Sequence, residues 1–339
     1  MSELRFGLIG LGHWGPNYAR LLNGVVRNAR LVACADLQQD RLQAVARLYP
    51  GVRLFANHEE LLAAGDLDAV IVATRATDHQ RVVEDSLEAG VHVLVEKPLA
   101  HTSEACESMI RCAERTGRHL MVGHTFLFNR AVQLIKRYIE EVELGSLRYF
   151  SFRRTGLGPI RQDVNALWDL APHDLSMLRY WLGADPVEVT ARGQSYLRPG
   201  IEDVVFLTLR YPTGILAGVQ VSWLDPIKDR RVTIVGDRKM VVYDDVHPTE
   251  KVRVYDKGAS YVPRGGEFAE FLAAVRDGDI VIPKLDSREP LHEQLEHFIE
   301  CVETGRTPRS DGRDGLAVVR ILERAQTELA ASAAVPVLQ

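Results

Sequence analysis

The sequence predicts an α/β protein in which a doubly wound parallel sheet is followed by an α+β domain with an open-faced, mostly antiparallel sheet. Continuous apolar runs alternate with amphipathic helical segments through the first third of the chain, as in a parallel sheet covered on both faces. A glycine-rich turn joins the first of these runs to a helix. Beyond about residue 145, strand-like runs alternate apolar and polar residues between turn signals. We expect one domain over residues 1–124 and a second over residues 125–339.

In the first domain, strand and helix signals follow one another in regular alternation. The predicted strands are residues 4–9, 31–35, 69–73, 91–95 and 119–122. The predicted helices lie near residues 15–24, 38–48, 58–64, 79–89 and 102–116. Apolar strands separated by helices indicate βαβ units and therefore a parallel sheet.

The second domain has a different pattern, with one face of the sheet packed on helices. Its predicted strands are residues 147–153, 187–191, 204–210, 215–223, 231–235, 240–243 and 251–255. Its predicted helices lie near residues 127–143, 166–182, 266–276, 288–304 and 313–331. The free face of such a sheet often becomes a subunit interface, so we expect a homodimer or homotetramer.

Composition excludes several classes of protein. Hydrophobic residues make up 46% and charged residues 26% of the 339 residues, as in ordinary globular proteins. The net charge of −5 gives no global attraction to nucleic acid or an anionic membrane. There is no signal segment or membrane-length apolar run, and the cysteines have no metal or disulfide spacing. We expect a cytoplasmic protein without a metal site; the scattered cysteines are Cys34, Cys106, Cys112 and Cys301.

The first turn carries a Gly-x-Gly-x-x-Gly pattern at Gly10, Gly12 and Gly15. The first glycine allows the tight strand-to-helix turn, the second lets a pyrophosphate approach the backbone, and the third lets helix and strand pack closely. The helix that follows offers N–H groups to the phosphates. The turn predicts dinucleotide binding, with His13 and Trp14 among the contacts, although Trp14 could instead cover the domain interface.

Asp36 ends the second predicted strand, where an acidic residue binds the adenosine ribose hydroxyls and repels a 2′-phosphate. This favours NAD, while Arg41 nearby keeps NADP possible. The alternative is that Asp36 only caps the following helix.

Polar residues follow the carboxyl ends of the parallel strands, where doubly wound sheets bind ligands. Lys97, between Glu96 and Pro98, is placed to hydrogen-bond a substrate hydroxyl group and to stabilise an alkoxide. The alternative is a salt bridge between Lys97 and Glu96, but X-Pro bonds in functional turns are the usual place for a cis peptide. His124 and Asn129 are candidate substrate contacts, with packing as the alternative, and His79 is a candidate cofactor contact that could instead begin a helix. The other candidate cofactor contacts here are Thr74, Thr77, Glu96 and Lys97.

In the second domain, Asp169 and His173 are four residues apart and share a helix face if they lie in its first turn. Pro172 is compatible with that position. A carboxylate beside an imidazole can fix its tautomer and make it a general base. The alternative is a capping aspartate and a structural histidine.

Taken together, these motifs resemble the glucose–fructose oxidoreductase, inositol dehydrogenase and MocA (Gfo/Idh/MocA) family over essentially the whole chain. The resemblance rests on the Gly10–Gly15 turn, Glu96-Lys97-Pro98, Gly123-His124 and Asp169-x-x-x-His173. It implies a Rossmann domain joined to an open-faced sheet domain, with Lys97, Asp169 and His173 as the catalytic set. Many members have an aspartate at the position of Ser176, a departure that bears on the substrate more than on the reaction.

The stretch from Asp163 to Ser176 is similar to the branch acting on nucleotide-linked sugars. The expected reaction is NAD-dependent oxidation of the C3 hydroxyl of a sugar such as a UDP-N-acetylhexosamine or its uronate. Alternatives are an inositol or free-sugar dehydrogenase, an NAD-dependent glycoside-cleaving enzyme and a non-catalytic sugar sensor. Arginine forks suit a diphosphate; the expected substrate contacts, for which a solvated surface loop is the alternative, are Arg153, Arg154, Arg161 and Asn165.

Overall fold

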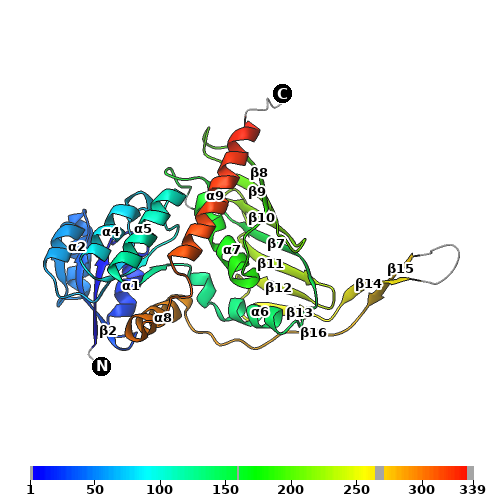
Figure 1. Cartoon of the computed structure of the whole chain (residues 1–339), viewed down its shortest axis with the longest axis horizontal. Coiled ribbons are helices and arrows are strands. Elements are labelled where there is room, and N and C mark those ends of the chain that lie inside the picture. Colours follow the sequence, from blue (N-terminus) through cyan, green and yellow to red (C-terminus); the bar gives the residue numbers. More distant parts are fainter. Residues whose placement is uncertain (1–2, 159, 264–270, 334–339) are drawn as a thin grey trace. The chain divides into compact units, whose positions relative to one another are not determined.

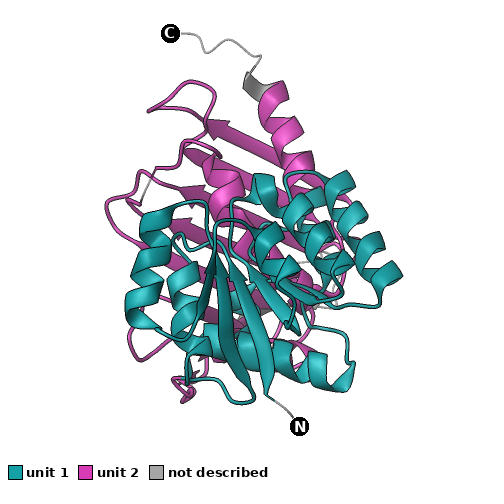
Figure 2. Cartoon of the chain, turned by 90° about the vertical axis from the view of Figure 1, so that its left-hand side faces the viewer, with its two compact units in different colours: residues 1–128, 288–320 teal, residues 129–287, 321–339 magenta. Residues whose placement is uncertain are grey.

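The computed structural model describes residues 3–158, 160–263 and 271–333. The chain forms two compact units, and each consists of two stretches of sequence (Figure 2). The first unit contains residues 1–128 and 288–320, and the second contains residues 129–287 and 321–339. The predicted boundary is a single one after residue 124, whereas the chain returns to its first unit over residues 288–320.

The first unit is built on a parallel sheet with the order β3-β2-β1-β4-β5-β6, which belongs to the blue to cyan part of the chain in Figure 1. The strand order reverses between the central strands β1 and β4. Doubly wound sheets bind their ligands at this switch point, beyond the carboxyl ends of the strands. All four residues of β4 are buried, as expected for a strand covered on both faces. The strands are β1 (Leu4–Ile9), β2 (Ala29–Ala35), β3 (Arg53–Phe55), β4 (Ala69–Val72), β5 (His92–Val95) and β6 (Leu120–Val122).

Helices with one buried face connect these strands. Local sequence sets several of their ends: Thr102 Oγ1 accepts a hydrogen bond from the Ala105 N–H at the start of α5, and Gly117 ends it with a φ of 65°. The helices are α1 (Gly15–Leu22), α2 (Gln39–Leu48), α3 (His58–Ala63), η1 (Ala76–Asp78), α4 (His79–Glu88), α5 (Ser103–Thr116), η2 (Thr125–Phe128) and α8 (Pro290–Thr304).

The second unit is built on a sheet with the order β16-β13-β12-β11-β7-β10-β9-β8, antiparallel except for the pair β7 and β10. Its strands bury alternate residues, so one face is covered. Phe150 and Phe152 of β7 stack on Trp181 there. The strands are β7 (Leu147–Thr155), β8 (Glu188–Gln194), β9 (Val204–Arg210), β10 (Leu216–Ser222), β11 (Asp229–Gly236), β12 (Met240–Asp244), β13 (Val252–Tyr255) and β16 (Ile280–Val281).

The covering helix of this sheet is α7 (Ala166–Leu182), which contacts β7, β9 and β10 and packs against α6 (Arg130–Glu140). The last helix, α9 (Gly312–Ala333), contributes residues to both units. The predicted fold class, a doubly wound parallel sheet and a mostly antiparallel sheet, is confirmed.

One predicted element is wrong. The expected helix over residues 266–276 is a strand in its described part, β15 (Phe271–Arg276), which pairs in antiparallel fashion with β14 (Gly258–Pro263). Residues 266–270 lie outside the described residues. A short apolar run is compatible with a helix or a strand, and here the preceding strand decides by supplying backbone partners. Among the described helices, none is both long and apolar enough to cross a membrane.

Candidate active site

The fold requires glycine at two of the three glycine positions in the glycine-rich turn, but not at the third. A Cβ on Gly10, whose φ is 94°, would lie 2.7 Å from the carbonyl carbon and oxygen of Ala73. A Cβ on Gly15 would lie 2.4 Å from the carbonyl oxygen of Gly10. At Gly12 the nearest atom would be Nη1 of Arg41, at 3.8 Å. The fold therefore leaves open the position where a pyrophosphate approaches the backbone, so the turn fits a dinucleotide.

Helix α1 begins beside this turn, with Trp14 as its N-cap and no acidic residue in its first turn. Its N-terminal N–H groups and dipole therefore remain suited to phosphate. Trp14 is partly exposed and meets the ring of His13 edge-on at 5.9 Å.

Asp36 connects the end of β2 to the glycine-rich turn. Its Oδ2 accepts a hydrogen bond from the Leu11 N–H at 2.7 Å, and its Oδ1 accepts one from the Gln38 N–H at 2.8 Å. Gln38, not Asp36, is the N-cap of α2, so the capping alternative does not hold. Arg41 Nη1 lies 3.4 Å from Oδ2. The carboxylate is thus fixed at the cofactor end of the sheet, where ribose hydroxyls can still use its remaining lone pairs.

The ends of β5 and β6 bring Glu96, Lys97 and His124 together. The peptide bond between Lys97 and Pro98 is cis. Glu96 is buried, and its Oε2 accepts a hydrogen bond from the Lys97 N–H at 3.2 Å. Both ring nitrogens of His124 are buried, and the charge on Lys97 is close enough to influence its titration. Burial, followed by that charge, lowers the pKa of His124 to about 3, so His124 is neutral at physiological pH.

His79 has the position predicted as its alternative, at the start of a helix. It begins α4, and its Nδ1 lies 3.0 Å from the carbonyl oxygen of Pro98 and 3.2 Å from that of Leu99. Burial lowers the pKa of His79 to about 4, so a neutral ring donates its Nδ1–H to these carbonyls. His79 therefore braces the turn after Lys97. Thr77 is exposed and Thr74 half-buried near the ends of the same sheet.

In the second unit, Asn165 and Asn129 are helix caps. Asn165 Oδ1 accepts from the Trp168 N–H, and its Nδ2 donates to Glu202 Oε2 at 2.6 Å and to Gln326 Oε1 at 2.9 Å. These contacts use both amide hydrogens of a buried side chain, which corrects the expected substrate contact at Asn165. Asn129 Oδ1 accepts from the Ala131 N–H at the start of α6.

Asp169 lies in the first turn of α7, which begins at Ala166, and His173 lies one turn further along the helix. Pro172 consequently lies inside the helix, not in the first turn as expected. Asp169 Oδ2 accepts a hydrogen bond from the indole N–H of Trp223 at 3.2 Å, and Oδ1 lies 3.4 Å from Arg161 Nη1.

Trp223 is not among the predicted site residues, although it is a partner of Asp169. The two residues are far apart in the chain, and β10, which ends at Ser222, brings them together. Both groups donate hydrogen bonds to Asp169, so they fix the position of its carboxyl group.

The three arginines of the expected diphosphate grip have separate positions. Arg154 is buried and binds Asp174 through Nε, 3.1 Å from both carboxylate oxygens, and Nη2, 2.7 Å from Oδ1. This fork is committed to the core of the unit, which corrects the expected substrate role of Arg154. Arg153 is exposed, and Arg161 also pairs with Asp163 at 2.6 Å.

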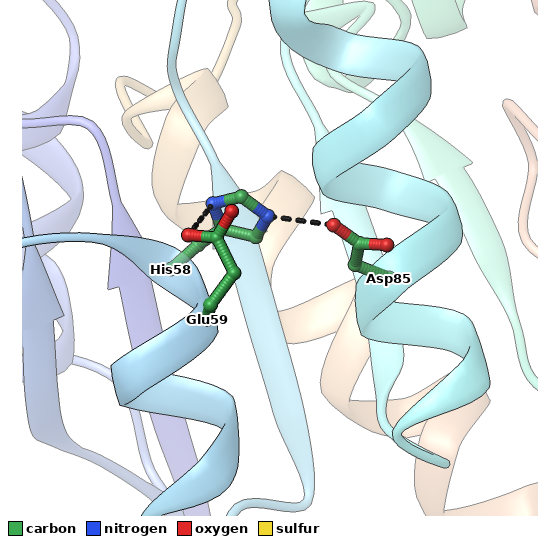
Figure 3. Close-up of side chains that lie close together, drawn as sticks. All are labelled: His58, Glu59 and Asp85. Atoms are coloured by element: carbon green, nitrogen blue, oxygen red, sulfur yellow. Dashed lines mark hydrogen bonds and ion pairs between the residues drawn. The ribbon is translucent and has the colours of Figure 1, made fainter.

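The first unit gathers His58, Glu59 and Asp85 into a cluster with metal-type side chains (Figure 3). The imidazole Nδ1 of His58 lies 2.9 Å from Glu59 Oε2, and its Nε2 lies 2.8 Å from Asp85 Oδ2. Arg81 also pairs with Glu59 at 2.6 Å. Because both ring nitrogens face carboxylates at hydrogen-bond distance and a cation is already present, the cluster is an ion-pair network joining α3 to α4 and gives no support for a metal site.

Comparisons with known proteins agree with this geometry. Residues 4–124 match the family model described as an oxidoreductase family with an NAD-binding Rossmann fold. Residues 132–242 match the GFO/IDH/MocA C-terminal domain.

Relatives cover nearly the whole chain. The UDP-N-acetylglucosamine 3-dehydrogenase of Acidithiobacillus ferrooxidans is 28% identical over 94% of this chain and 95% of its own. A solved structure of that dehydrogenase superimposes on this chain with a TM-score of 0.81 at 26% identity, and the match covers 98% of this chain and 99% of the dehydrogenase. The myo-inositol 2-dehydrogenase of Thermotoga maritima is 26% identical over 92% of both chains. The expected fold, oxidoreductase class and NAD cofactor are confirmed.

Proposed function

Because the chain belongs to the Gfo/Idh/MocA family of NAD-dependent oxidoreductases, we propose that it oxidises the C3 hydroxyl group of a nucleotide-linked sugar. The proposed substrate class is a UDP-N-acetylhexosamine or its uronate. The observation that carries this proposal is the similarity to a UDP-N-acetylglucosamine 3-dehydrogenase over both domains.

The proposed catalytic set is Lys97, Asp169 and His173. NAD, when bound, supplies the hydride acceptor. His173 takes the hydroxyl proton, with Lys97 as the alternative acceptor, and Asp169 orients the imidazole. Lys97 stabilises the substrate oxygen as it becomes negative. The hydrogen bonds from Trp223 and Arg161 support the role of Asp169, because they hold its carboxylate in place.

The proposed cofactor contacts include the glycine-rich turn, Asp36 and Arg41. If the substrate is a nucleotide-linked sugar, Arg153 and Arg161 bind its diphosphate. A free polyol is the second candidate, because the burial of Arg154 against Asp174 removes one of three expected diphosphate ligands.

The experiment measures NADH formation with UDP-N-acetylglucosamine, its uronate, free N-acetylglucosamine and myo-inositol. Oxidation of a UDP-sugar alone supports the proposal, whereas oxidation of myo-inositol alone supports the second candidate. Arg153→Ala is expected to raise KM for the UDP-sugar and to leave KM for a polyol unchanged. Product formation without net NADH would instead indicate the glycoside-cleaving alternative, and binding of sugar without turnover would indicate the sensor.

The catalytic assignment is tested by Lys97→Ala, which should abolish turnover and leave NAD binding intact. Lys284→Ala, at an exposed lysine, is the matched control. An active Lys97→Ala enzyme contradicts the assignment.

We also propose that the outer face of the second unit's sheet joins copies of the chain into a homodimer or homotetramer. Apolar side chains lie in register across six strands there, and such a stripe is costly to leave in water. Val235→Glu should lower the mass measured by sedimentation, and an unchanged assembly contradicts this interface. The residues of the stripe are Leu216, Tyr149, Val235, Met240, Tyr255 and Ile280.

A further inference from the structure

Next to the Lys97 turn, polar side chains of the first unit form a buried array. Tyr18 donates its hydroxyl hydrogen to Glu96 Oε1 at 2.7 Å, and Gln294 Nε2 donates to Tyr18 Oη at 3.1 Å. The other carboxylate oxygen of Glu96, Oε2, accepts from the Lys97 N–H. Tyr18 and Gln294 are completely buried, and Glu96 is 7% exposed. The array therefore connects α1 and α8 to the turn that carries Lys97.

The directions of these hydrogen bonds indicate the ionisation state of Glu96. The Gln294 NH₂ group can only donate, so the Tyr18 oxygen accepts from it and the single tyrosine hydrogen points at Glu96. Since the Lys97 N–H faces the other oxygen, both carboxyl oxygens act as acceptors. A carboxylate satisfies this pattern, whereas a carboxylic acid would bring its own hydrogen against one of the donors.

Burial and hydrogen bonding have opposite effects on the pKa of Glu96, so the hydrogen bonds of the array influence whether Glu96 is ionised. Burial raises the pKa of Glu96 above its ordinary value, although the Tyr18 hydrogen bond, followed by the charges on Lys97 and His13, lowers it in part. Burial and the nearby Glu96 charge raise the pKa of Tyr18 well above its ordinary value, so Tyr18 keeps its hydrogen. Without the Tyr18 donor, the balance at Glu96 moves toward the neutral acid.

Glu96 is the negative group adjacent to Lys97 in the chain, and the two charges interact. His124, which is also close to Lys97, stays neutral and adds no opposing positive charge. The local field at Lys97 thus depends on whether Glu96 is ionised.

We propose that Tyr18 and Gln294 are positioning residues for the reaction, because they hold Glu96 as a carboxylate that keeps the Lys97 side chain charged and in place. This inference rests on the proposed role of Lys97. Tyr18 and Gln294 touch neither the substrate nor the cofactor in this scheme; they act through Glu96.

The first test is Tyr18→Phe, which removes the donor and keeps the ring. A charge-assisted hydrogen bond lost from Glu96 should lower kcat about tenfold and move the acidic limb of the pH profile up by about one unit, because Glu96 then takes up a proton at higher pH. KM for the sugar should change little, since the substrate contacts remain. Tyr211→Phe, at a buried tyrosine of the other unit, is the matched control and should leave the profile unchanged.

Gln294→Leu tests the second link of the array. Its effect on the pH profile should disappear when Tyr18 is already phenylalanine, because Gln294 acts through the Tyr18 hydroxyl group. Additive effects of the two substitutions on kcat and on the pH profile would contradict this order of action.

A measurement without substrate separates this inference from the proposed function. A neutral carboxyl group and a carboxylate absorb at different infrared frequencies, so difference spectra against Glu96→Gln give the pH at which Glu96 titrates. That pH should be about one unit higher in Tyr18→Phe than in the wild type. If the titration curves of Glu96 coincide in two folded proteins, the inference is wrong. If instead no sugar is oxidised but the curves differ, the proposed substrate fails and the electrostatic array stands.

Discussion

Replacing Gly12 by alanine should separate cofactor binding from folding. The added methyl group would meet no protein atom closer than Arg41 Nη1 at 3.8 Å, and the residue is not among those with a positive φ. The folded chain can therefore accept alanine, and the smaller entropy of the unfolded chain should raise the free energy of unfolding by about 0.4–1 kcal/mol.

The bound cofactor should not accept it. The pyrophosphate approaches the backbone at this glycine, so the methyl group overpacks the complex at a cost of about 1–3 kcal/mol. That cost corresponds to a Kd for NAD about 5- to 150-fold higher. Gly15→Ala is the contrasting variant, because its Cβ would lie 2.4 Å from the Gly10 carbonyl oxygen and should destabilise the fold itself.

Calorimetric titration with NAD and urea unfolding measure the two effects on the same samples. A Gly12→Ala protein that is stable and binds NAD as tightly as the wild type would refute the assignment of this turn as the pyrophosphate site. Equal stability of Gly15→Ala and wild type would refute the packing argument.

Three further predictions follow from buried or shared groups. Asp174→Asn leaves the buried Arg154 guanidinium without its charge partner, so it should lower the free energy of unfolding, measured by urea titration, by about 3–5 kcal/mol. The double variant Arg154→Met/Asp174→Leu should recover most of this loss. A mild effect of Asp174→Asn alone contradicts the ion pair. Asp36→Asn should raise KM for NAD about tenfold and narrow its advantage over NADP, since a charge-assisted contact to ribose is lost; steady-state kinetics with both cofactors checks this. His79 and His124, with pKa values lowered to about 4 and about 3, stay neutral in the fold while the unfolded imidazoles take up protons. Stability is therefore complete above about pH 6.5 and falls by about 1.4 kcal/mol per pH unit for each histidine down to about pH 4; an equally steep fall in a variant with both histidines replaced by glutamine would contradict it.

Much of the fold could be predicted from local pattern. The six residues of β1 and the seventeen of α7 coincide with the predicted ranges, because a mostly apolar run before the glycine-rich turn marks β1, and an Asn cap and a Gly end mark α7. The β14–β15 hairpin could not be predicted in this way. Its register depends on backbone partners that a short apolar run does not identify.

The burial of Arg154 had a signal that sequence reasoning did not use. Side chains alternate along a strand, so Arg154 lies on the same face of β7 as Phe150 and Phe152. An arginine on the covered face requires a buried partner, and Asp174 on α7 supplies it. The Tyr18–Gln294 contact had no comparable signal, because it joins residues 276 positions apart.

In both units, one criterion distinguishes structural from functional residues. It is whether contacts within the protein explain why that residue type occupies its position. Gly10, Gly15 and Arg154 are each explained by a protein neighbour at contact distance. Gly12 is not, and neither is the exposed position of Arg153, whose nearest carboxylate oxygen lies 3.8 Å away. Residue types that the fold does not require are the ones to assign to ligands. By this reasoning the cofactor assignment depends most on Gly12 and the nucleotide part of the substrate on Arg153, so these two substitutions test the proposed function with the least disturbance of the fold.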